Sequence, residues 1–155
     1  MTIESDIAFL ERVPIFRRLG GGALRVLAIG SEGYSVRAGE VLFAAGEPAD
    51  CAYLVQEGSF WLEPERPAAG EVVAEPGTLL GEAALLTETR RPATATARED
   101  SAVLRIPRAM FLKMLDSYPD AAQRLRELIV ARTDQWAREM ENVRAALARD
   151  REPQG

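Results

Sequence analysis

The residues best suited to binding chemistry lie in one stretch, Leu79–Ala97, which reads LLGEAALLTETRRPATATA. Gly81 allows close approach of the backbone, and a helical turn beginning after it directs its first N–H groups toward an anion. The planar guanidinium of Arg91 presents a fork of donors that suits a phosphate. The carboxylate of Glu82 accepts hydrogen bonds from sugar hydroxyls beside that phosphate. Together these residues predict a pocket for a sugar phosphate.

The same two ionisable residues also have a structural interpretation. Taken alone, Glu82 and Arg91 would favour an ion pair beside a turn, without any ligand. Arg90 is expected to face solvent, because neighbouring side chains on an extended chain point to opposite sides. The surrounding sequence therefore decides between the two interpretations.

That surrounding sequence resembles the phosphate-binding cassette of cyclic nucleotide-binding domains, whose pattern is Phe-Gly-Glu-x-Ala-Leu, a short spacer, then Pro-Arg-x-Ala-Thr. The residues that fall on this pattern in register are Gly81, Glu82, Ala84, Leu85, Arg91, Ala93 and Thr94. The resemblance implies that Arg91 pairs with the cyclic phosphate and that Glu82 binds the ribose 2′-hydroxyl. It also implies that the amides of Ala83 and Ala84 complete the cradle. With this pattern around it, the pair is better interpreted as a nucleotide or phosphate site.

Three positions depart from the family pattern. Leu80 stands where the family has phenylalanine, and Arg90 stands where it has proline. Pro92 has no N–H, although in the family the amide after the arginine donates to the phosphate. One lost charge-assisted hydrogen bond costs about 1.5–3 kcal/mol of binding. The predicted ligand site comprises Gly81, Glu82, Ala83, Ala84, Arg91, Pro92, Ala93 and Thr94, with no catalytic or metal-binding residue.

The composition excludes several other classes of function. The chain has 155 residues, 47% of them hydrophobic, which is enough for one domain with a sizeable core. A net charge of −5 provides no basic field to attract nucleic acid. One cysteine, Cys51, and no histidine exclude a disulfide framework, a structural zinc site and a Ser-His or Cys-His catalytic pair. Cys51 is expected to be a small residue at the start of a strand.

The N-terminal residues carry acids where a signal peptide needs bases. No apolar run reaches the ~20 residues of a membrane span. The chain is therefore predicted to be cytoplasmic, with no membrane association.

Helices are expected to lead into the region that holds the site. Ser5 or Asp6 is predicted to cap a short helix that stops before Pro14. The triplet Gly20–Gly22 lacks the Gly-Lys-Ser/Thr continuation of a phosphate-binding P-loop. It is predicted to be a flexible connection to a helix from about Ala23 to Gly30.

From residue 34 to residue 106 the pattern changes to short strands and turns, typical of a sandwich or barrel-like roll. The predicted strands are Tyr34–Val36, Val41–Phe43, Ala52–Val55, Phe60–Leu62, Glu71–Ala74, Ala93–Arg98 and Ala102–Ile106. The last two are expected to pair through the turn Glu99–Ser101, and Gly46–Asp50 is expected to be another turn. The family resemblance extends over about Phe16 to Pro119.

Two helices are predicted to follow the strands. Pro107 opens a short one that ends near Tyr118, and a longer one runs from about Asp120 to Arg149 without Gly or Pro. Its apolar residues Ile129, Trp136 and Val143 repeat every seven positions, but Arg132 and Glu139 interrupt a coiled-coil seam. The longer helix is predicted to pack on its own domain or against a second copy.

In the family, residues of the helix after the roll often cap the base. By this resemblance Trp136 would stack on a purine, and Arg132 would stack or donate hydrogen bonds. A position in the core or in a dimer interface is the favoured alternative for Trp136. Thr94 and Thr96 would contact the base or simply face solvent.

The predicted fold is α+β, an antiparallel, jelly-roll-like, double-stranded β-roll with N-terminal helices and a long C-terminal helix. It forms one domain over residues 1–155, with N-terminal helices in about 1–33, the roll in 34–106 and C-terminal helices in 107–149. The predicted function is a non-enzymatic cyclic nucleotide sensor that signals through its C-terminal helix to a second copy or another protein. Cyclic AMP is predicted as the ligand rather than cyclic GMP. Many cyclic-GMP binders carry threonine at the position after the phosphate arginine, whereas Pro92 at that position has no hydroxyl.

Two other functions remain open from the sequence. The first is a domain of the same fold without a ligand, acting as a dimerisation or interaction module, which Arg90 and Pro92 favour. The second is a DNA-binding regulator, which the acidic charge disfavours and whose helix-turn-helix would begin about where the chain ends. Direct DNA binding is therefore not expected.

Overall fold

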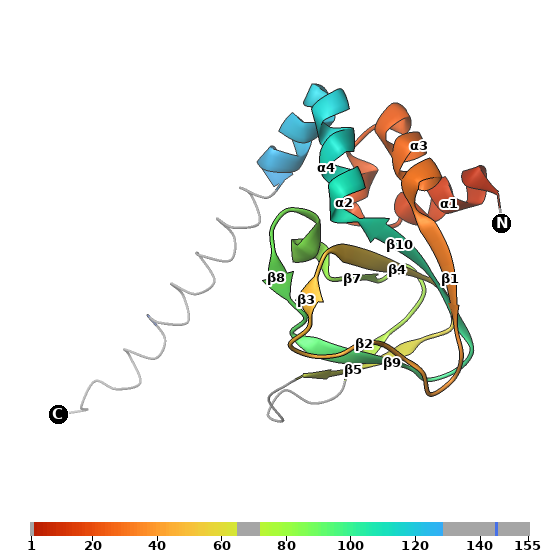
Figure 1. Ribbon diagram of the computed structural model, residues 1–155. Helices are drawn as coiled ribbons and strands as arrows, with labels where there is room; N and C mark the ends of the chain where they lie inside the picture. The colour runs from red at the N-terminus through yellow and green to blue at the C-terminus, as the bar shows by residue number, and fades with distance from the viewer. Residues whose placement is uncertain (1, 65–71, 129–144, 146–155) are drawn as a thin grey trace.

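The computed structural model describes residues 2–64, 72–128 and 145. Helices α1 (Ile3–Leu10), α2 (Pro14–Arg17) and α3 (Gly21–Gly30) precede the strands, and α4 (Arg108–Ser117) follows them (Figure 1). Residues 119–128 are also helical. The remainder of the predicted long helix, with Arg132 and Trp136, and the loop 65–71 lie outside the described residues, apart from residue 145.

The strands of the described residues form two four-stranded sheets and one two-stranded ribbon, with every pair antiparallel. Their bounds are β1 (Glu32–Val36), β2 (Val41–Phe43), β3 (Pro48–Ala49), β4 (Cys51–Glu57), β5 (Phe60–Pro64), β6 (Val72–Ala74), β7 (Leu79–Leu80), β8 (Thr89–Arg90), β9 (Ala93–Ala97) and β10 (Ser101–Pro107). The first sheet has the order β1-β10-β4-β7, the second β2-β9-β5-β6, and the ribbon is β3-β8. The prediction of an α+β fold built on an antiparallel roll is confirmed.

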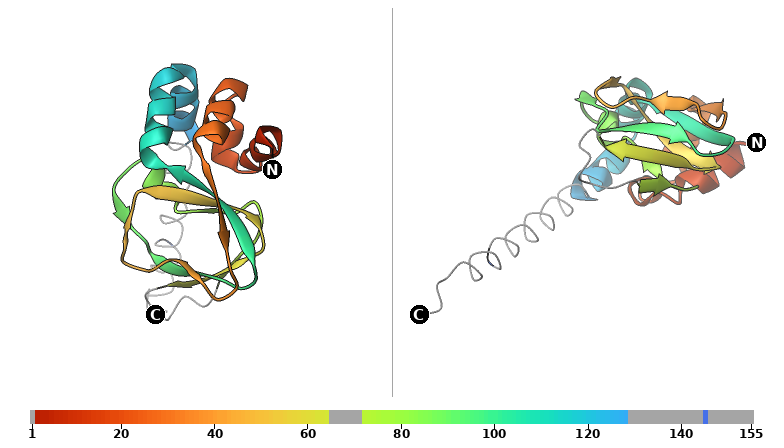
Figure 2. Two further views of the ribbon diagram at one scale, coloured as in Figure 1. Left: turned by 45° about the vertical axis from the view of Figure 1, so that its right-hand side comes forward. Right: turned by 90° about the horizontal axis from the view of Figure 1, so that it is seen from below.

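The helices cover one face of the first sheet, and the second sheet lies against its other face (Figures 1 and 2). Strand β4 is therefore buried on both sides, since its side chains alternate between two apolar cores. Ala52 and Leu54 belong to the core beneath the helices, together with Phe16 and Phe111. Val55 belongs to the core between the sheets.

The N-terminal helices differ from the prediction in their starts. Thr2 caps α1, because its Oγ1 accepts from the amide of Ser5 at 3.2 Å. The prediction of Ser5 or Asp6 as the cap was wrong, since both lie inside the first turns. The short helix α2 was not predicted, and Pro14 opens it at a position where a missing N–H costs nothing. Helix α3 begins at Gly21, so part of the glycine triplet is helical.

The strand prediction was wrong about the closing pair. Strand β9 pairs with β2 and β5, whereas β10 pairs with β1 and β4, so the two belong to different sheets. The corner between them is tied to a third segment instead. The amide of Arg98 donates to Ser59 O at 2.9 Å, and the amide of Ser59 donates to Ser101 Oγ at 3.1 Å. The short strands β3, β7 and β8 were also not predicted.

Candidate functional site

Gly81 connects the first sheet to the short 3₁₀ helix η2 (Glu82–Leu85). Its φ of 80° lies in the left-handed region, which glycine adopts without strain. A Cβ atom at this position would collide with Nη1 of Arg91. Glycine is therefore required at position 81 for two reasons. It adopts the left-handed backbone conformation, and it leaves the space that the guanidinium of Arg91 occupies.

The residues at the start of η2 have different surroundings. The amide of Ala84 donates to Gly81 O at 3.0 Å, so it takes part in the turn itself, and Ala84 is fully buried. Ala83 and Glu82 are exposed on the surface of the turn. Ala83 consequently lies at the surface close to Gly81, while the Ala84 amide is engaged within the turn.

Arg91 lies inside the roll directly after β8, and it is only 4% exposed. Its Cζ atom is 4.4 Å from the centroid of the Phe43 ring and 5.5 Å from that of Tyr53. Its Nη2 donates to Cys51 Sγ at 3.3 Å. Its Nη1 is buried and has no hydrogen-bond partner among the described residues. A buried cationic donor without a partner is costly, and an acceptor placed against this nitrogen would offset that cost.

The backbone around β8 explains why Arg91 points inward and Arg90 outward. The amide of Arg91 donates to Glu47 O, and the amide of Gly46 donates to Arg91 O, both at 2.8 Å. This pairing keeps the chain extended, so consecutive side chains lie on opposite faces. Arg90 is exposed, as the sequence predicts, and its Nη1 donates to Gly46 O at 2.9 Å.

The remaining predicted site residues lie at the start of β9. Pro92 is exposed, and Ala93 is half-buried. The hydroxyl of Thr94 accepts from the amide of Ala45 at 2.9 Å and so holds the connection between β2 and β3. Thr96 pairs in register with Trp61, which is exposed on the outer face of the second sheet. The structure thus brings Arg91 against Gly81, and it directs Thr96 away from them.

Sequence reasoning missed the residues that surround the guanidinium. The rings of Phe43 and Tyr53 are stacked, with centroids 5.9 Å apart and planes at 19°. Burial, followed by a hydrogen bond with Cys51, raises the pKa of Tyr53 to about 12. The available signal was the alternation of strand residues, which places Phe43 and Tyr53 on inward positions.

Arg105, on strand β10 of the first sheet, shows the more usual arrangement of a partly buried arginine. Arg105 Nη2 lies 3.5 Å from Asp50 Oδ1, and its Nη1 lies 3.9 Å from Glu32 Oε2. Arg105 therefore has carboxylate partners within the fold. Nη1 of Arg91 differs in this respect, since it has no partner in the part of the chain that the structure describes.

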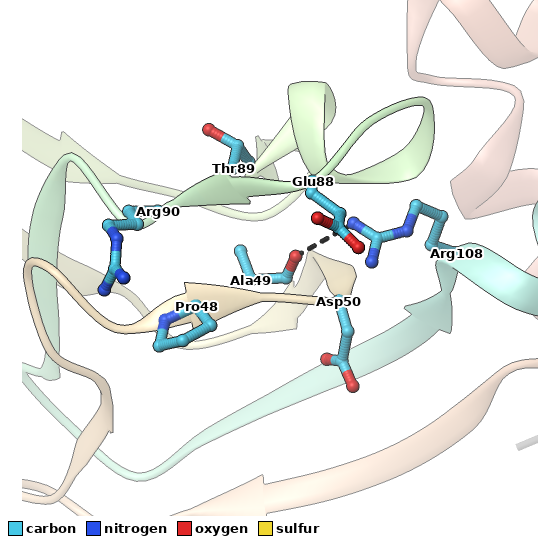
Figure 3. A pocket seen from close by; sticks show the side chains of 7 residues that line it. All are labelled: Pro48, Ala49, Asp50, Glu88, Thr89, Arg90 and Arg108. Atoms are coloured by element: carbon cyan, nitrogen blue, oxygen red, sulfur yellow. Dashed lines mark hydrogen bonds between the residues drawn. The ribbon is translucent and has the colours of Figure 1, made fainter.

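A separate hollow of about 530 Å³ lies along the β3-β8 ribbon (Figure 3). The residues lining it are Pro48, Ala49, Asp50, Glu88, Thr89, Arg90 and Arg108. Figure 3 shows Arg90 and Arg108 at opposite ends of this hollow, with Glu88 beside Arg108. Its charges are mixed and its two guanidinium groups already bond to backbone carbonyls, whereas Nη1 of Arg91 has no hydrogen-bond partner among the described residues.

Arg108 links three segments around that hollow. Its Nη1 donates to Ala49 O at 3.1 Å, to Thr87 O at 2.9 Å and to Ala84 O at 3.4 Å. Arg108 is also the first residue of α4. The turn that carries η2 is thereby connected to the start of the C-terminal helices.

The described residues contain no group of three or more His, Cys, Asp or Glu side chains placed to hold a metal ion. Within the same residues, no helix combines the length and apolar character needed to cross a membrane.

Comparison with known proteins identifies relatives of this arrangement. A family model described as "Cyclic nucleotide-binding domain" matches residues 34–118. The cyclic nucleotide-gated potassium channel mll3241 of Mesorhizobium japonicum is 32% identical over 120 residues, which are 77% of this chain and 33% of the channel. The chain thus spans only 33% and 7% of the first two curated relatives that it matches.

Solved structures show the same fold. A cyclic nucleotide-binding-like protein from Brucella abortus is 38% identical, with a TM-score of 0.64 over 72% of this chain and 98% of that chain. The N-terminal domain of a transcriptional regulator from Streptomyces coelicolor is 27% identical, with a TM-score of 0.78 over 85% of this chain and 94% of that chain. Both similarities cover more than two thirds of this chain.

Proposed function

Because the chain belongs to the cyclic nucleotide-binding domain family, we propose that it binds a cyclic nucleotide through the guanidinium of Arg91 and acts as a non-enzymatic regulatory module. The observation that carries this proposal is the buried Nη1 of Arg91, which lacks a hydrogen-bond partner among the described residues. The cyclic phosphate would supply the missing acceptor and the compensating charge. The turn at Gly81 lies against this nitrogen. Ala83 follows two residues later and is exposed, and its amide would donate to the phosphate.

The finer features of the ligand are also proposals. Glu82, exposed at the start of η2, would accept a hydrogen bond from the ribose 2′-hydroxyl. Pro92 offers no hydroxyl, which favours cyclic AMP over cyclic GMP. Arg132 and Trp136 would cap the base from the C-terminal helix.

The binding signal would pass to the C-terminal helices. Arg108 supports this route, because its guanidinium bonds to carbonyls of Ala84 and Thr87 while its backbone begins α4. A shift of η2 on binding would therefore act on the start of those helices. The receiver would be a second copy or another protein in the cytoplasm.

A second candidate is a domain of the same family that has no ligand and serves as a dimerisation or interaction module. Two observations favour it. Pro92 has no N–H to offer a phosphate. The amide of Ala84 is already engaged by Gly81 O. In this case the cost of the buried guanidinium would go uncompensated.

Titration calorimetry with cyclic AMP, cyclic GMP and 5′-AMP tests the proposed function. We expect micromolar or tighter binding of a cyclic nucleotide, with cyclic AMP preferred. The open 5′-monophosphate should bind more weakly, since it carries an additional charge and lacks the ring. If a folded sample binds neither cyclic nucleotide, the ligand-free module becomes the better explanation.

Replacing Pro92 by alanine is expected to increase the affinity for cyclic AMP. The substitution restores an N–H next to Arg91, and a hydrogen bond to a charged group contributes about 1.5–3 kcal/mol, roughly a 10- to 100-fold change. Calorimetry measures the dissociation constant of the variant. Pro76→Ala, in the exposed turn after β6, is the matched control and should leave the affinity unchanged. Equal affinities for Pro92→Ala and wild type would contradict this prediction.

A further inference from the structure

Three side chains surround the Arg91 guanidinium, and we call Phe43, Tyr53 and Cys51 the arginine-holding cluster. Building on the proposed function, we infer that Phe43 and Cys51 are positioning residues. They fix the guanidinium in one orientation before a ligand arrives, with Nη1 directed at the glycine turn. This assigns a binding role to residues that lie outside the cassette in sequence.

The aromatic rings fix the plane of the guanidinium. Phe43 and Tyr53 come from β2 and β4, and their rings are stacked at 19°. Arg91 Cζ lies 4.4 Å from the Phe43 centroid and 5.5 Å from the Tyr53 centroid, within the range of cation–π attraction. Attraction to both rings favours an orientation in which the cation lies over the aromatic faces.

Cys51 fixes the rotation of the guanidinium within that plane. Nη2 donates to Cys51 Sγ at 3.3 Å, and Cys51 is 2% exposed at the start of β4. With Nη2 held there, the other terminal nitrogen lies against Gly81, so close that a Cβ atom on residue 81 would collide with it. A thiol is a weak acceptor, so this contact competes little with an arriving anion.

The consequence of this arrangement is a preorganised cation. An arginine free to rotate loses side-chain entropy when it binds a ligand, whereas one already held loses little. A purely structural role for the cluster makes a different prediction. In that case its residues only fill the core, and their replacement would change stability without changing the orientation of Arg91.

Nuclear magnetic resonance of the arginine side chains tests the orientation without any ligand. The Arg91 guanidinium signals of the free protein are assigned by their loss in Arg91→Lys. We expect them to be shifted upfield by the Phe43 ring, with separate signals for the two Nη groups. Phe43→Leu should remove the upfield shift, and Cys51→Ala should merge the two Nη signals, whereas Cys51→Ser should keep them apart.

The matched control is Trp61→Leu, because the Trp61 ring contacts a different arginine on the outer face. Cζ of Arg98 lies 5.6 Å from the centroid of that ring. This variant should leave the Arg91 signals unchanged. Thermal unfolding of every variant separates loss of fold from loss of orientation. Arg91 signals that are averaged in the wild type, or unaltered in both Phe43→Leu and Cys51→Ala, would overturn the inference.

Measurements of cyclic AMP affinity then test whether the orientation of the guanidinium matters for binding. Phe43→Leu and Cys51→Ala should each weaken cyclic AMP binding by about tenfold through lost preorganisation, and Cys51→Ser should restore it. Unchanged affinity in both variants would overturn the positioning role. A wild type with restrained Arg91 signals but no nucleotide binding would reject the proposed function while supporting the held orientation.

Discussion

Replacing Arg91 by methionine is expected to reduce the affinity for cyclic nucleotide by more than about 100-fold, since two hydrogen bonds to a charged phosphate contribute about 3–6 kcal/mol. The same substitution should leave the fold as stable as the wild type or more stable. Methionine fills a similar volume against Phe43 and Tyr53, and it removes a buried donor that lacks a partner among the described residues. Loss of binding with gain of stability is the signature of a residue retained for its ligand.

Calorimetric titration and urea denaturation of the ligand-free protein measure the two effects. Arg90→Met is the matched control, because it changes the neighbouring arginine, which is exposed. That control should alter neither affinity nor stability appreciably. If Arg91→Met binds as tightly as the wild type, the buried guanidinium is not the phosphate ligand. If it unfolds far more easily, Arg91 is a structural residue.

Replacing Phe60 by alanine is expected to destabilise the protein by about 3–5 kcal/mol, a large share of the 5–15 kcal/mol typical of a domain. Phe60 is fully buried between the two sheets. Its register partners are Ala74 on β6 and Ala97 on β9, whose small side chains leave the space that the ring fills. Neither of these alanines is large enough to fill the resulting cavity.

Trp61→Ala gives the comparison for Phe60→Ala on the same strand. Trp61 points to the opposite face and is 38% exposed, so its loss should destabilise the protein much less. Urea denaturation followed by circular dichroism measures both variants. Equal losses of stability for the two substitutions would mean that Phe60 does not fill a tightly packed core position between the sheets.

The sequence predicted the strands that carry a clear apolar pattern and failed on those that do not. Val41–Phe43 was predicted with its observed bounds as β2. Strands β3 and β8 consist of Pro48–Ala49 and Thr89–Arg90, which have no strand-like pattern of their own. They are extended because they pair with each other across about forty residues of chain. Such pairing depends on the whole fold, so no local signal reveals it.

The same limit applies to the site. Gly81 and Arg91 were identified from their residue types and from the resemblance of a short stretch of sequence to the family's cassette. The contacts of Arg91 with Phe43 and Cys51 depend on how β2 and β4 are placed around the end of β8. The predicted pairing of the last two strands failed for a related reason. The short corner at Glu99–Ser101 moves the chain from one sheet to the other, although its length would also suit a hairpin.

The register of the two sheets has a consequence for how the chain folds. Glu32 on β1 lies opposite Arg105 on β10, and Val41 on β2 lies opposite Thr96 on β9. Each pairing closes a long loop, and such nonlocal contacts slow folding relative to helical bundles. The surroundings of Arg91 are nonlocal in the same way, because Phe43 on β2 and Cys51 on β4 are far from Arg91 in the sequence. Under the proposed function, a ligand that binds only this folded arrangement would raise the free energy of unfolding of the domain.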